Sequence, residues 1–124
     1  MTVFHASGVF TSDEDGLLEL AFQDDRGRYV LLSRSLEHDP QDTALGLDGP
    51  YLEIGGEDHG AYDAIAELDV TPERVRLAFD PGALGLAADS SPIEIQGDEV
   101  TAQTGEIAAT VSRLLAVRQG GQSL

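Results

Sequence analysis

Residues 61–79 read Ala-Tyr-Asp-Ala-Ile-Ala-Glu-Leu-Asp-Val-Thr-Pro-Glu-Arg-Val-Arg-Leu-Ala-Phe, a pattern that is typical of a β-hairpin. From Tyr62 to Val70 every even position is apolar and three of the odd positions are acidic, which is the two-residue period of a strand with one buried face. The proline at 72 suits a type I turn, and apolar residues alternate with arginines from Arg74 to Phe79. This stretch therefore predicts two antiparallel strands, with carboxylates of the first facing arginines of the second.

A second hairpin is predicted in the N-terminal half, with strands at 17–23 and 28–34. Leucine and phenylalanine alternate along one face of the first strand. The two strands are joined by Asp-Asp-Arg-Gly, in which Gly27 suits a left-handed turn position because it has no Cβ.

Shorter elements complete the chain. Strands are predicted at 51–54 and 93–95, and residues 1–10 are expected to add an edge or N-terminal strand. From 105 to 117 the apolar residues recur at helical spacing, which predicts a helix with one apolar stripe and with Thr104 as its N-cap. We expect this helix to cover one face of the sheet.

These elements predict an α+β domain over residues 1–118, mainly an antiparallel meander sheet of about six or seven strands covered by one C-terminal helix. A small β-sandwich or a partial barrel is the alternative. A chain of 124 residues suits one domain, and we expect residues 119–124 to form a disordered tail.

The charge of the chain is strongly one-sided, with 23 acidic residues, 7 basic residues and a formal net charge of −16. A surface this negative repels nucleic acid and anionic membranes, whereas it attracts a basic protein. A salt-adapted or solubility-tuned surface would have the same composition, so the net charge alone does not identify a partner. Cysteine is absent and the first residues do not resemble a signal peptide, which favours the cytoplasm.

Residues 36–51 read Leu-Glu-His-Asp-Pro-Gln-Asp-Thr-Ala-Leu-Gly-Leu-Asp-Gly-Pro-Tyr, a long acidic connection between two predicted strands. Connections of this length are uncommon in compact domains and are usually either binding loops or disordered. Leucines that can anchor it and glycines that permit turns favour a binding loop.

The motif Arg34-Ser35-Leu36-Glu37-x-Asp39-x-Gln41-Asp42-x-x-Leu45-Gly46-Leu47-Asp48, followed by an aromatic residue and by His59-Gly60-x-Tyr62, resembles the immunity protein 10 family of bacterial polymorphic toxin systems. The similarity runs from about Tyr29 to Phe79. The resemblance implies a small non-enzymatic protein that binds and neutralises a co-encoded toxin, and it leaves the oligomeric state open.

The acidic connection is the predicted binding element. Its carboxylates can form charge-assisted hydrogen bonds with basic side chains of a toxin, and a tyrosine supplies rigid contact area. We therefore expect the partner-binding residues to be Glu37, Asp39, Gln41, Asp42, Asp48 and Tyr51. The competing hypothesis is that these carboxylates only solubilise the connection, that Arg34 pairs with one of them, and that Tyr62 belongs to the core.

Enzymatic chemistry finds little support in the sequence. The chain lacks cysteine, lysine and a Gly-x-Ser-x-Gly motif, which removes the usual covalent nucleophiles and a phosphate-binding lysine. Paired carboxylates of a glycosidase would need an apolar, aromatic-lined cleft, and the chain has no tryptophan. We expect no catalytic residues and no cofactor.

A calcium- or ligand-binding accessory module is the alternative function. Glu37, Asp39, Asp42 and Asp48 could supply oxygen ligands, although their spacing does not match an EF-hand loop. The histidines at 5, 38 and 59 do not have a zinc-ligand spacing.

Overall fold

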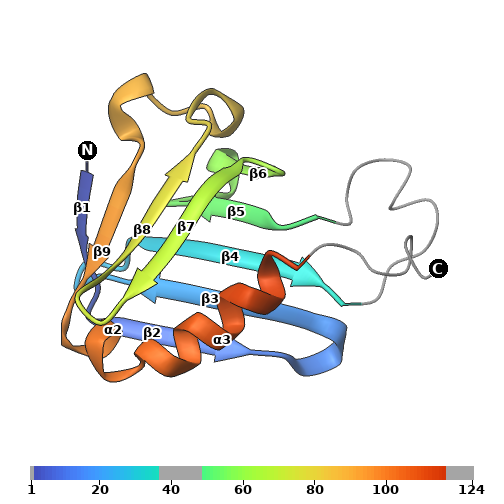
Figure 1. Ribbon diagram of the computed structural model, residues 1–124. Helices are drawn as coiled ribbons and strands as arrows, with labels where there is room; N and C mark the ends of the chain where they lie inside the picture. The colour runs from blue at the N-terminus through green and yellow to red at the C-terminus, as the bar shows by residue number, and fades with distance from the viewer. Residues whose placement is uncertain (1, 37–48, 117–124) are drawn as a thin grey trace.

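The computed structural model describes residues 2–36 and 49–116. In this part of the chain nine strands form a five-stranded and a four-stranded sheet, and Figure 1 shows the strands of one sheet crossing those of the other at a steep angle. The predicted α+β class is confirmed, with the strands divided between two sheets that do not close into a barrel. The predicted tail at 119–124 lies outside the described residues.

The five-stranded sheet is antiparallel throughout. Its strands, in spatial order, are β2 (Gly8–Ser12), β3 (Leu17–Gln23), β4 (Tyr29–Ser35), β5 (Tyr51–Ile54) and β6 (Gly60–Tyr62). The β3–β4 hairpin is the one predicted at 17–34. Its turn is fixed by the Asp24 carboxylate, which accepts hydrogen bonds from the backbone N–H groups of Arg26 and Arg28, and by Gly27 with φ +81°.

The four-stranded sheet combines the two ends of the chain. Its order is β1 (Thr2–His5), β9 (Ile93–Gln96), β8 (Arg74–Phe79) and β7 (Ile65–Thr71). β1 pairs with β9 in parallel, and the other pairs are antiparallel. The predicted β7–β8 hairpin is confirmed, together with ion pairs of Arg74 with Asp69 at 3.3 Å and of Arg76 with Glu67 at 2.7 Å.

The single strand predicted over 61–70 is wrong. Asp63 adopts a left-handed conformation with φ +58° and separates β6 from β7, so the chain crosses from one sheet to the other at this point. A β-bulge between Ile65 and Glu67 then shifts the alternation and turns Ala66 outward. Tyr62 is 43% exposed, so the competing hypothesis that it belongs to the core is also wrong.

Six short helices complete the described residues. They are η1 (Glu14–Gly16), η2 (Glu57–His59), η3 (Gly82–Leu84), η4 (Ala88–Ser90), α2 (Asp98–Ala102) and α3 (Thr104–Leu114). The expected N-cap role of Thr104 is wrong because α2 immediately precedes α3. The Thr104 hydroxyl instead donates to the carbonyls of Val100 and Thr101 and thereby satisfies the C-terminal end of α2.

The core lies between the inner faces of the two sheets and α3. Leu20, Phe22 and Leu32 from the larger sheet and Leu77 and Ile95 from the smaller one belong to one buried cluster. The buried stripe of α3 contains Ile107, Thr110, Val111 and Leu114. α3 contacts β3, β4 and β7, so it packs against both sheets rather than covering one (Figure 1).

Candidate binding surface

Of the six residues predicted to bind a partner, Tyr51 lies in the described part of the chain. The other five, Glu37, Asp39, Gln41, Asp42 and Asp48, lie outside it. Tyr51 begins β5, and Ser33 near the end of β4 is its cross-strand partner. The acidic connection therefore leaves and rejoins the larger sheet beside Tyr51.

Arg34, the first residue of the motif, faces the inner side of the sheet. It is only 9% exposed, and its guanidinium donates hydrogen bonds to the carbonyls of Leu114 and Ala116 at the C-terminal end of α3. A cation at this end of a helix is also favoured by the helix dipole. Within the described residues Arg34 thus ties β4 to α3.

The outer faces of the two sheets differ in character. On the four-stranded sheet, alternation places charged and polar side chains outward, and several of them engage one another, as in the pairs Arg74–Asp69, Arg76–Glu67 and Gln96–Glu94. These side chains find their hydrogen-bond and ion-pair partners within the protein. The five-stranded sheet presents instead a cluster of aromatic and apolar side chains.

We call this cluster the tyrosine face, and its members are Phe10, Tyr29, Leu31, Tyr51, Glu53 and Tyr62. Strand register brings them together: Leu31 pairs with Glu53, and Tyr51 pairs with Tyr62. Phe10 is 56% exposed. Exposed aromatic side chains gathered on one sheet face are a recurrent feature of protein interfaces.

Glu53 lies at the centre of the tyrosine face. Its two carboxylate oxygens each accept a hydrogen bond from a tyrosine hydroxyl, Oε1 from Tyr51 at 2.7 Å and Oε2 from Tyr29. These hydrogen bonds, followed by burial, raise the pKa of Tyr29 and of Tyr51 to about 12. Both hydroxyls therefore remain protonated donors at neutral pH and hold the carboxylate in place.

Close packing fixes the ring of Tyr51. It stacks obliquely on Tyr62, with ring centroids 5.1 Å apart and ring planes at 55°. Its hydroxyl lies over Gly60, where a Cβ atom would collide with it. The position of Tyr51 therefore favours glycine at residue 60 in β6.

At one edge of the tyrosine face lies Asp63, the residue at which the chain passes from one sheet to the other. The backbone N–H of Asp63 donates to the carbonyl of Pro50 at 3.0 Å, and the Asp63 carboxylate lies against Gly49 in a space that a Cβ atom could not share. Asp63 has a strained left-handed backbone. The Asp63 carboxylate is exposed and lies next to Tyr62 in the chain.

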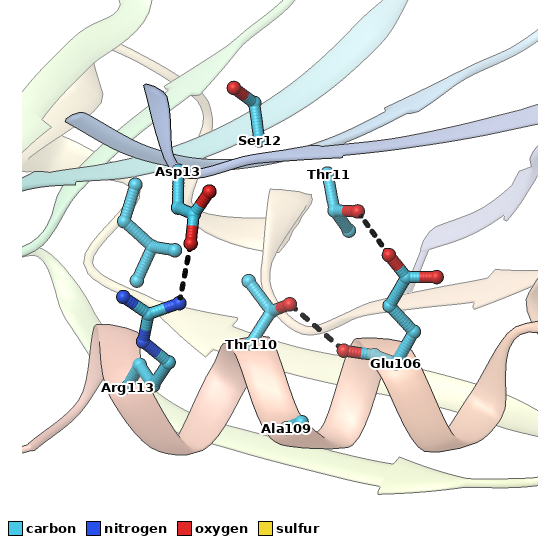
Figure 2. Close-up of a pocket in the computed structure, with 8 residues that line it drawn as sticks. Thr11, Ser12, Asp13, Glu106, Ala109, Thr110 and Arg113 are labelled. Atoms are coloured by element: carbon cyan, nitrogen blue, oxygen red, sulfur yellow. Dashed lines mark hydrogen bonds and ion pairs between the residues drawn. The ribbon is translucent and has the colours of Figure 1, made fainter. Parts of the chain in front are cut away.

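A groove of about 320 Å³ between β2 and α3 is a second candidate. Figure 2 shows that its polar side chains are engaged with one another across it: Arg113 pairs with Asp13 at 3.3 Å, and Thr11 donates to Glu106 at 2.6 Å. These contacts join α3 to the larger sheet. We assign the groove to packing rather than to ligand binding.

The described residues contain no candidate metal site, because no three histidine or acidic side chains among them are grouped closely enough to hold an ion. His59 contacts the carbonyl of Leu84 through Nδ1 at 2.9 Å. The four carboxylates considered for calcium all lie outside residues 2–36 and 49–116. No helix in these two ranges is both long and apolar enough to cross a membrane.

The chain matches the family model of immunity protein 10 over residues 4–104 of its 124 residues. The matched region includes the strands β2 to β9, the second half of β1 and the whole of the tyrosine face. Comparisons with curated proteins and with solved structures gave no match.

Proposed function

The chain belongs to the immunity protein 10 family, and we propose on this basis that it binds and neutralises a cognate bacterial toxin by occlusion. The match over residues 4–104 is the observation that carries the proposal. The proposed partner is a protein toxin with a basic surface, and the chain acts in the cytoplasm without catalysing a reaction or using a cofactor.

The charge distribution supports a basic partner. Four of the 23 acidic residues fall in residues 37–48, and the remainder are distributed over the described elements. Within the described residues four arginines are occupied by internal ion pairs, those at positions 28, 74, 76 and 113. The uncompensated negative charge attracts a basic protein over a long range and increases its association rate.

The acidic connection and the adjacent sheet form the proposed contact region. We propose that Glu37, Asp39, Gln41, Asp42 and Asp48 contact the toxin together with Tyr51. The support is their chain connection to the β4–β5 end of the sheet, where Tyr51 lies on an aromatic face. Tyr51 supplies an aromatic side chain of the kind that is enriched at binding hot spots.

Co-expression tests the function. Cells that produce the toxin domain encoded beside this gene should survive only when the chain is also present. Death in both cultures would contradict the proposal, and the catalytically dead toxin domain serves as the control for expression burden.

A charge reversal tests the contribution of the connection. Replacing Glu37, Asp39 and Asp42 by arginine should slow association with the toxin and weaken its dependence on salt. The matched control reverses Asp25, Glu73 and Asp89, which are exposed residues in other parts of the fold and change the net charge equally. Equal association rates for the two triple variants would show that position in the connection is unimportant.

A further inference from the structure

Glu53 is an unusual carboxylate for an outward-facing position. It is only 8% exposed, and its neighbours on the tyrosine face are aromatic and aliphatic. In residues 2–36 and 49–116 no arginine forms an ion pair with it. Its charge is held by two tyrosine hydroxyls instead.

This arrangement leaves the Glu53 carboxylate able to accept further hydrogen bonds. A carboxylate has about four lone-pair positions, and the tyrosines occupy one on each oxygen. A buried ion pair normally requires water to be removed from both partners. Here most of that desolvation has already occurred on the acidic side, because Glu53 is largely buried in the free protein and accepts hydrogen bonds from two tyrosine hydroxyls.

The surrounding rings are suited to a cation. Aromatic faces attract ammonium and guanidinium groups, and the ring of Tyr62 is 43% exposed beside that of Tyr51. In the register Tyr62 lies diagonally from Glu53, and diagonal neighbours are about 7–8 Å apart, within the reach of one arginine side chain. The outward residues of β2–β6 include a second carboxylate, Glu19, and no basic side chain.

We propose that the tyrosine face is the docking surface for the toxin and that Glu53 receives an arginine or lysine of the toxin, which also contacts the exposed ring of Tyr62. This inference rests on the proposed function and assigns a surface and a chemistry to it. Phe10 and Leu31 extend the contact as an apolar surface toward β2. The net charge of −16 selects a basic protein over an anionic membrane or nucleic acid as the occupant.

The test uses the full chain and the toxin domain encoded beside its gene, with affinity measured by calorimetry at low and moderate salt. Tyr62→Ala removes an exposed ring and should raise Kd about 30-fold, as expected for an interface hot spot. Glu53→Gln keeps the size of the side chain and removes its charge, and it should raise Kd about tenfold while reducing the dependence of Kd on salt.

Two matched controls lie on the outer face of the other sheet. Glu94→Gln removes the same charge, and Val3→Ala shortens another exposed apolar side chain, which is 45% exposed. Both should leave Kd within about twofold, as expected for substitutions outside the contact. Thermal melting of all four variants establishes that each is folded.

The outcomes separate the inference from the function. If the wild-type chain binds the toxin and the two tyrosine-face variants bind equally well, this inference is overturned and the proposed function stands. If the wild-type chain does not bind, both are overturned. A dimer of the purified chain that Tyr62→Ala dissociates would assign the tyrosine face to self-association and also overturn the inference.

Discussion

Replacement of Arg34 by methionine should destabilise the protein without changing its fold. The guanidinium donates to two carbonyls at the end of α3 and is 9% exposed. Hydrogen bonds from a charged group contribute about 1.5–3 kcal/mol each when buried. Because Leu115 and Ala116 are exposed, water can replace part of this interaction, so we expect a loss of about 2 kcal/mol in total.

Urea unfolding measures this loss as a lower midpoint with an unchanged slope. For a chain of this size the same loss lowers Tm by roughly 6–10 °C. Amide hydrogen exchange should locate the effect at the last turn of α3, where the freed carbonyls end the helix. Arg34→Lys should recover about half of the loss, since an ammonium keeps the charge but lacks the planar fork of donors.

Arg26→Met is the matched control because Arg26 lies in an exposed turn and its substitution removes the same charge. Its free energy of unfolding should stay within about 0.5 kcal/mol of the wild-type value. An Arg34→Met protein as stable as this control would refute the role of the guanidinium in holding α3 to β4.

Three further predictions concern titratable and packed groups. Absorbance titration of tyrosinate should show Tyr29 and Tyr51 ionising near pH 12, and Glu53→Gln should lower the pKa of both tyrosines toward 10. Because these pKa values are raised in the folded protein, the stabilisation from the hydrogen bonds to Glu53 is complete below pH 10 and is lost as pH rises through 12. Although burial opposes the effect, hydrogen bonds from the side chain of Arg28 and from the amides of Arg26 and Arg28 lower the pKa of Asp24 below 3.8, so Asp24→Asn should reduce stability at neutral pH and lose its effect as pH falls through the native pKa. An equal stability difference at pH 2 and pH 7 would contradict this assignment. Gly60→Ala should displace the Tyr51 hydroxyl from Glu53 and lower the pKa of Tyr51 alone, whereas Gly8→Ala, at a position with open space, should leave the titration unchanged.

The hairpins could be predicted because their signals are local. The alternation of Leu18, Leu20 and Phe22 and the turn at Gly27 are encoded within a few residues, and the β3–β4 hairpin follows from them. The division into two sheets depends on pairing across the whole chain, such as that of Thr2 with Ile93. Residue periodicity does not specify such partners.

The errors within residues 61–70 have a local physical cause. A left-handed aspartate at 63 and a bulge after Ile65 interrupt a run whose apolar residues fit one continuous strand. The expected N-cap at Thr104 fails for a similar reason, because the short helix α2 ends just before this residue. In each case a break in the backbone geometry overrides an otherwise regular pattern.

The tyrosine face was missed because its residues are distant in the sequence. Strand register alone brings Tyr29, Glu53 and Tyr62 together. One signal was present: the run Tyr-Val-Leu-Leu at 29–32 is apolar on both faces of a strand, which indicates that neither face is fully solvated. The five predicted contact residues of the acidic connection stay a prediction.

A stoichiometric titration tests the central claim most directly. The activity of the proposed cognate toxin is measured while the chain is added in known amounts. Occlusion predicts that activity falls in proportion to added chain, reaches zero near equimolar concentrations, and returns when high salt separates an unmodified toxin from the complex. Inactivation by a small fraction of an equivalent, or full activity in excess chain, would contradict it.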